Sequence, residues 1–107
     1  YATLELYNAG EDRILLRRID CYNAKEGAKE EVNCSLSYSA DKQISLYVRL
    51  EVKGDAICTF SYSRDGLDWE EIGSDFKARE GDWIGAKIGL FAISEIKKND
   101  GGYVEIY

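Results

Sequence analysis

The sequence predicts an all-β protein, an antiparallel two-sheet sandwich or jelly roll with about eight strands. Three observations support this prediction. Apolar and polar residues alternate with a period of two along most of the chain, which is typical of half-buried strands. No helical period persists for more than about one turn. Clusters of Gly, Asn and Asp separate the alternating runs at short intervals, as they do in sandwiches. We expect one domain over residues 1–107.

The first half of the chain contains three expected strands, over residues 2–7, 13–22 and 32–37. In the first of them Ala2, Leu4 and Leu6 share one face, because side chains alternate across a strand. The cluster NAGED at 8–12 is expected to form the first turn. The polar stretch 23–31 is expected to form a loop or a short helical turn.

The second half begins with the clearest strand, QISLYVRLEVKG at 43–54. Its alternation predicts one aliphatic face, which consists of Ile44, Leu46, Val48, Leu50 and Val52. Turns are expected at Gly54-Asp55 and at 64–67, where Asp65-Gly66 is a strong hairpin signal. The further expected strands are 56–63, a broken strand over 68–73 and 75–78, 82–94, and a last one within 103–107. In 56–63 the inward set is either Ala56, Cys58, Phe60 and Tyr62 or the residues between them.

Charge and composition exclude several classes of function. The formal net charge of −6 gives no basic patch, so nucleic acids and anionic membranes are not expected as partners. No apolar run reaches the length of a membrane span, and no segment resembles a signal peptide. The absence of histidine excludes Ser-His and Cys-His nucleophiles and His-ligated metal sites.

The three cysteines, Cys21, Cys34 and Cys58, lack the spacing of a zinc site. Cys21 and Cys34 could form a disulfide across neighbouring strands in an oxidising compartment. The alternative, which we favour, is that all three are small buried thiols.

The ends of the sequence suggest a piece of a longer polypeptide. There is no methionine, and Tyr1 already lies in a strand-like pattern. We therefore expect partner domains and targeting signals to lie outside this chain.

Aromatic residues are the candidates for sugar binding, because exposed rings contact the apolar faces of sugars. They are Tyr47, Tyr62, Trp69 and Trp83. The alternative for the two tryptophans is that they close the ends of the core. For Tyr62 the two interpretations are evenly matched.

Two acidic residues and one lysine complete the candidate sites. Asp65 and Asp68 could bind a structural calcium ion, although the D-x-[DN]-x-[DN]-G pattern is absent and turn chemistry explains Asp65-Gly66. Lys87 could contact a neighbouring domain. The other acidic residues fall on outward strand positions or in loops, so we expect no catalytic carboxylate pair and no cofactor other than this possible calcium.

The motifs FSYSRDGLDWEEIG (60–73) and GDWIGAKIGLF (81–91) resemble the C-terminal sandwich domain of bacterial glycoside hydrolase family 43 enzymes. YATLELY (1–7) and CYNAKEGAKEEV (21–32) resemble its earlier part, so the likeness covers nearly the whole chain. The departures are Trp69, where the family more often has Phe, and Ala92, where Cys is common.

The resemblance implies a concanavalin A-like module of β-xylosidases and arabinofuranosidases, of which this chain would be the second half. The implied role is non-catalytic, because a five-bladed propeller domain of the same polypeptide carries the hydrolysis of xylosyl or arabinosyl linkages. The sandwich would pack on that propeller and could support a homo-oligomer, in the bacterial periplasm or outside the cell. The alternative is an independent carbohydrate-binding module for xylan or arabinoxylan oligosaccharides.

Overall fold

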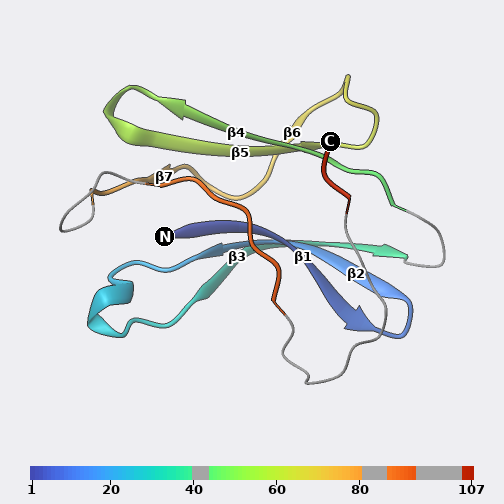
Figure 1. Cartoon of the computed structure of the whole chain (residues 1–107), viewed down its shortest axis with the longest axis horizontal. Coiled ribbons are helices and arrows are strands. Elements are labelled where there is room, and N and C mark those ends of the chain that lie inside the picture. The colour runs from blue at the N-terminus through green and yellow to red at the C-terminus, as the bar shows by residue number, and fades with distance from the viewer. Residues whose placement is uncertain (40–43, 81–86, 94–104) are drawn as a thin grey trace.

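The computed structural model describes residues 1–39, 44–80, 87–93 and 105–107. These residues form seven strands in two antiparallel sheets that lie one over the other (Figure 1). The helices in this part of the chain are two 3-10 turns, Ala24–Glu26 and Gly54–Ala56, and neither has the length or apolarity to cross a membrane. The predicted all-β class with two antiparallel sheets is confirmed.

The first sheet contains β1 (Ala2–Gly10), β2 (Arg13–Asp20) and β3 (Glu31–Ser39) in that order. The hairpin of β1 and β2 turns at Glu11 and Asp12, whose φ angles of 51° and 56° match the twist of a two-residue hairpin turn. The turn is therefore shorter than the predicted 8–12, because β1 continues in pairing to Gly10.

The second sheet contains β4 (Tyr47–Lys53), β5 (Ile57–Ser63), β6 (Glu70–Glu71) and β7 (Phe76–Lys77). The central strand is β5, which pairs with β4, β6 and β7. The interruption between β6 and β7 confirms the predicted broken strand. Within it Ile72 donates its N–H to the carbonyl of Phe60 at 2.9 Å, and its side chain is buried in the core.

The core lies between the two sheets. Its buried centre is Leu16 from β2, Tyr62 from β5 and Ile72. Half-buried side chains pack around this centre, namely Leu4, Cys34, Leu36, Tyr38, Leu46 and Phe60. In β5, Cys58, Phe60 and Tyr62 of the first predicted set share the core side, whereas Ala56 is exposed and precedes the strand. Thr59 and Ser61 of the other set are buried too.

A buried ion pair lies between the sheets on one side of this core. Arg18 on β2 is fully buried, and its Nη2 lies 2.6 Å from Oδ1 of Asp20 in an ionic contact that lacks hydrogen-bond alignment. Its Nη1 donates to the carbonyl of Ser74 at 3.1 Å, and its guanidinium stacks 4.1 Å above the ring of Phe60. Arg18 thus links β2 to two parts of the second sheet.

Asn33 adds β3 to the same polar contact. The register between β2 and β3 shifts at this residue, so Asn33 is the extra residue of a bulge. Its Nδ2 donates to Asp20 at 2.8 Å and to the hydroxyl of Ser74 at 3.0 Å. β3 therefore lies over the segment between β6 and β7.

The opposite side of the sandwich is open. Register places Leu6 of β1 beside Leu16 and places Val48 and Val52 of β4 beside Tyr62 and Cys58, so all three lie on inner faces. They are nevertheless 51%, 59% and 52% exposed. Val48 and Val52 thus share the predicted aliphatic face but are not buried, because β4 is an edge strand and no layer of the described residues covers this part of its inner face. We call Leu6, Val48 and Val52 the open side.

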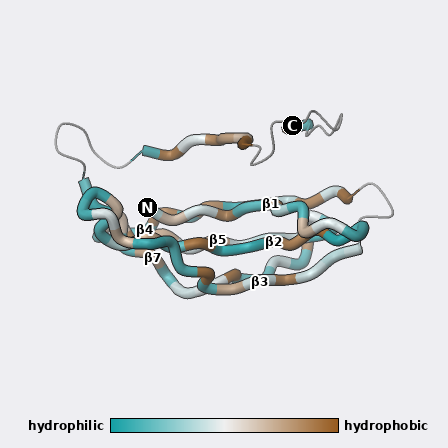
Figure 2. The backbone as a smooth tube through the Cα atoms, turned by 90° about the horizontal axis from the view of Figure 1, so that it is seen from below, coloured by the Kyte–Doolittle hydropathy of each residue, from teal (hydrophilic) through white to brown (hydrophobic). Residues whose placement is uncertain are grey.

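The last two predicted strands are not formed where the structure describes them. Residues 87–93, within the predicted 82–94, and residues 105–107, within 103–107, have no strand pairing. Residues 87–93 lie apart from both sheets, beyond β1 (Figure 2), so none of the described strands lies beside them for backbone pairing. The other residues of both predicted strands lie outside the described part. The predicted strand 43–54 is also shorter, since β4 begins at Tyr47.

The three cysteines are free thiols. Cys21 and Cys58 are buried and Cys34 is half-buried. Of the two alternatives, the structure shows thiols and no Cys21–Cys34 disulfide.

We expect Asp20→Ala to lower the free energy of unfolding by about 3–5 kcal/mol, because Arg18 would stay buried without its counter-ion. The control is Glu5→Ala, which removes the more exposed pair with Arg17 (2.9 Å) and should cost less than about 1 kcal/mol. Urea unfolding followed by tryptophan fluorescence measures both. Equal losses in the two variants would contradict a stabilising role for the buried pair.

Gly73→Ala should destabilise the fold more than Gly27→Ala. Both glycines have positive φ, 74° and 80°, so both substitutions carry a backbone cost of about 1–2 kcal/mol. Only at Gly73 would the new Cβ meet neighbours, at 2.8 Å from Cγ of Arg18 and 2.9 Å from Oδ1 of Asn33. The same urea titration measures the difference in unfolding free energy between the two variants. If there is no difference, the Arg18 side chain moves away from the new Cβ at little energetic cost.

Candidate functional site

Two cavities lie at one end of the sandwich. At this end β3 finishes, residues 44–46 lead into β4, and β5 runs into the turn that follows it. The larger is about 430 Å³ and the smaller about 290 Å³. Arg64 lines both of them. We call them the serine cavity and the acidic cavity after their linings.

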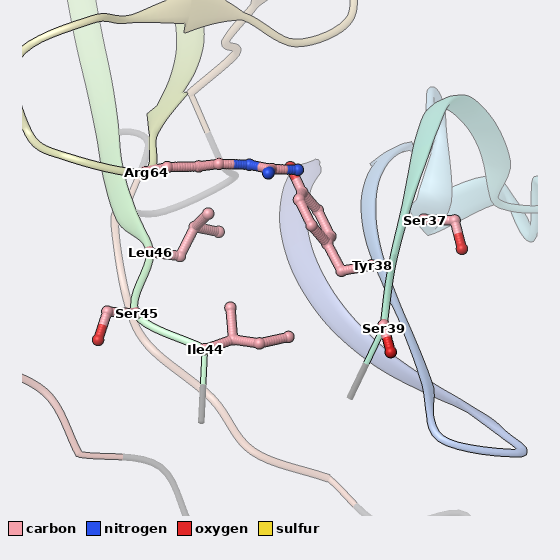
Figure 3. A pocket seen from close by; sticks show the side chains of 7 residues that line it. All are labelled: Ser37, Tyr38, Ser39, Ile44, Ser45, Leu46 and Arg64. Atoms are coloured by element: carbon pink, nitrogen blue, oxygen red, sulfur yellow. The ribbon is translucent and has the colours of Figure 1, made fainter. Parts of the chain in front are cut away.

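The serine cavity lies between the end of β3 and residues 44–46. Figure 3 shows the side chain of Arg64 reaching across it to the ring of Tyr38, with Ile44 and Leu46 on the near side. The guanidinium carbon stands 4.6 Å from the centre of the Tyr38 ring. The other lining residues are Ser37, Ser39 and Ser45. Arg64 is therefore the one charged residue among the described residues that line this cavity.

The acidic cavity is lined by Tyr62, Ser63, Arg64, Asp65, Asp68 and Glu70. The Tyr62 hydroxyl donates to Oε2 of Glu70 at 2.6 Å. This hydrogen bond to a carboxylate, together with burial, raises the pKa of Tyr62 well above the ordinary value for tyrosine. Tyr62 is 8% exposed, so it offers its hydroxyl edge rather than a ring face.

The turn after β5 owes its shape to one carboxylate. Oδ1 of Asp65 accepts from the Ser63 hydroxyl at 2.9 Å and from the backbone N–H groups of Leu67 and Asp68 at 2.8 and 2.9 Å. These bonds lower the pKa of Asp65, since they favour the charged form. Gly66 has a φ of 78°, which other residues rarely adopt.

Within the described residues, the geometry adds no metal ligands to the predicted calcium site at Asp65 and Asp68. Asp65 and Asp68 line the same cavity, but Oδ1 of Asp65 is already the acceptor of the turn. Over the described residues, no group of three or more His, Cys, Asp or Glu side chains could hold a metal ion. A calcium site at Asp65 and Asp68 stays a prediction.

The predicted aromatic residues do not gather on one exposed face. Trp69 is covered by Arg49, whose guanidinium stands 3.7 Å from the ring centre. Tyr47 is half-exposed, and its ring lies against Gly66. Trp83 lies outside the described residues. Only Tyr62 belongs to the cavities, and Lys87 is exposed on the separate segment 87–93.

Sequence reasoning missed Tyr38 and Arg64, which form the centre of the site. Tyr38 continues the alternation of Cys34 and Leu36 on the inner face of β3, so its position could have been extended from the strand pattern. Nothing local indicates Arg64, because its contact with Tyr38 joins residues 26 positions apart.

A family model described as "Beta xylosidase C-terminal Concanavalin A-like domain" matches residues 1–106. No curated protein and no solved structure matches the chain. The match covers the sheets, both cavities and the segment 87–93.

We expect the stability advantage of wild type over Tyr62→Phe to disappear at alkaline pH. Near pH 8 the lost hydrogen bond should cost about 1 kcal/mol. Because the folded pKa of Tyr62 is raised, the unfolded chain releases this proton first, and wild-type stability falls as pH rises above about 10. Urea unfolding of both proteins across this range measures the gap, and a constant gap would contradict the Tyr62–Glu70 interaction.

Proposed function

Because the chain belongs to the family of β-xylosidase C-terminal concanavalin A-like domains, we propose that it is a non-catalytic accessory domain. In this role it packs on the catalytic domain of the same glycoside hydrolase and supports it. The catalytic domain would be a five-bladed propeller acting on xylosyl or arabinosyl linkages. The expected location is the bacterial periplasm or the outside of the cell.

The observation that carries this proposal is the open side. Leu6, Val48 and Val52 are inner-face residues of two edge strands, and each is more than half exposed. Apolar side chains grouped in this way mark surfaces that bind another protein layer. Edge strands also present unpaired N–H and C=O groups to a partner.

Segment 87–93 adds further apolar side chains on this side of the molecule. Ile88, Leu90, Phe91 and Ile93 are 75%, 79%, 57% and 79% exposed. Water contact on so many apolar groups is unfavourable by about 25 cal/mol per Å² of apolar area. A partner that covers the segment and the open side together would recover this free energy. Further strands of the same module, the catalytic domain and a second copy of the chain are all partners of this kind.

The acidic residues support a non-catalytic role. Glycoside hydrolysis needs two carboxylates on opposite sides of the scissile bond, one of them as proton donor. In the acidic cavity, Asp65 shapes the turn and Glu70 accepts from Tyr62. Asp65 and Glu70 already accept hydrogen bonds from the protein, and both line one small cavity rather than opposite walls of a cleft.

Glycan binding is the second candidate function, and the end cavities favour it. The flat aromatic surface expected of a binding module is not formed by Tyr47, Tyr62 and Trp69. The two cavities, which share Arg64, instead combine hydrogen-bonding side chains with the ring of Tyr38 and two aliphatic residues. Such a site suits a short soluble oligosaccharide better than an extended polysaccharide surface.

The packing role predicts that the open side controls association with the remainder of the enzyme. The double variant Val48→Ser/Val52→Ser should weaken binding of this chain to the separately produced catalytic part by about tenfold or more. Isothermal calorimetry and sedimentation measure the complex.

The matched control is Val32→Ser, since Val32 is 58% exposed on β3, away from the open side. It should leave association unchanged. If both variants bind as wild type, the open side does not pack on the catalytic part.

A further inference from the structure

Arg64 separates two cavities of opposite charge. In the serine cavity its guanidinium is the one charge among the described lining residues. In the acidic cavity it faces Asp65, Asp68 and Glu70. Despite these neighbours, Arg64 takes part in no ion pair within the part of the chain that the structure describes. Within that part its guanidinium is placed against the Tyr38 ring rather than against a carboxylate.

We propose that this site binds an acidic disaccharide, with the carboxylate of a uronic acid unit on Arg64 in the serine cavity and a neutral sugar unit in the acidic cavity. The proposal rests on the glycan-binding function put forward above and names its ligand. It assigns the central role to Arg64 and Tyr38, not to an exposed aromatic face.

The position of the guanidinium supports a carboxylate ligand. Contact with Tyr38 at 4.6 Å places the planar group among the residues that line the serine cavity (Figure 3). A planar guanidinium donates two parallel hydrogen bonds to a carboxylate, and an orientation fixed in advance reduces the entropy lost on binding. Ile44 and Leu46 lie beside it and can contact the apolar face of the same sugar ring.

The acidic cavity suits the neutral unit. Carboxylates accept hydrogen bonds from sugar hydroxyls, and those of Asp68 and Glu70 line this cavity. Oδ1 of Asp65 is occupied by the turn, and Tyr62 already donates to Glu70. Asp68 and the second oxygen of Glu70 are therefore the acceptors that remain for a hydroxyl pair.

Charge and size distinguish this ligand from phosphate and from long chains. The three carboxylates around Arg64 repel the two charges of phosphate more than the single charge of a uronic acid, because repulsion grows with charge. Cavities of about 430 and 290 Å³ lie near the lower end of the range for small-molecule sites. Each suits one sugar unit.

The test is a titration of the 107-residue chain, followed by NMR chemical shifts and calorimetry. The probes are xylotriose, a xylo-oligosaccharide of the same length carrying glucuronic acid, and inorganic phosphate. We expect the acidic oligosaccharide to bind about tenfold more tightly than xylotriose at low salt. Added salt should reduce this preference, and phosphate should not compete.

Arg64→Gln should abolish the preference while keeping the fold. Arg49→Gln is the matched control, because Arg49 also stacks on an aromatic ring, that of Trp69 at 3.7 Å, but lines neither cavity. It should bind both oligosaccharides as wild type does. Circular dichroism and the urea midpoint verify that each variant is folded.

Three results would overturn the proposal and leave different conclusions. Equal binding of acidic and neutral probes would leave the glycan-binding function standing without its acidic ligand. No binding of any oligosaccharide would remove both and leave the packing role, which depends on the open side. Loss of the preference in Arg49→Gln but not in Arg64→Gln would place the ligand on the Trp69 face.

Discussion

The buried charge of Arg18 is the constraint on which the arrangement of the two sheets depends. A guanidinium without water must find a counter-ion and hydrogen-bond acceptors, and here Arg18 pairs with Asp20 of its own strand and donates to the Ser74 carbonyl. Asp20 follows it on β2, the Ser74 carbonyl belongs to the break between β6 and β7, and Asn33 joins both from β3. A slip of one sheet over the other would separate these groups. An apolar core has no comparable directional requirement, so this contact fixes the register of the sandwich.

The same contact explains why one side of the sandwich is closed and the other is open. Where Ser74 crosses to Asn33 and Arg18, chain from both sheets covers the core. No equivalent segment joins β1 to β4 within the described residues, and the inner-face side chains there reach solvent. The open side and the end cavities are neighbours, because Val48 pairs with Tyr62, which lines the acidic cavity. A partner layer that covers Val48 therefore also lies close to the end cavities.

Local pattern was sufficient for most strands and insufficient for the site. Alternation correctly predicted the strands that became β1, β2, β3 and β5, and the shared face of Ala2, Leu4 and Leu6, because each depends on neighbours along one strand. It failed for residues 87–93, where a strand needs a partner that the alternation cannot supply. It also could not foresee that Arg49 would cover Trp69 or that Arg64 would reach Tyr38. Such contacts depend on how sheets and turns meet, which is a long-range property.

Each sheet is built from a continuous stretch of chain, the first from residues 2–39 and the second from residues 47–77. Pairing within each sheet joins mainly neighbouring segments, whereas contact between the sheets closes much longer loops. Short loops close at lower entropic cost, which favours hairpins as the earliest structures during folding. The contact between the sheets, which removes water from Arg18, is therefore expected to form after the hairpins. The order of assembly follows from the order of the strands.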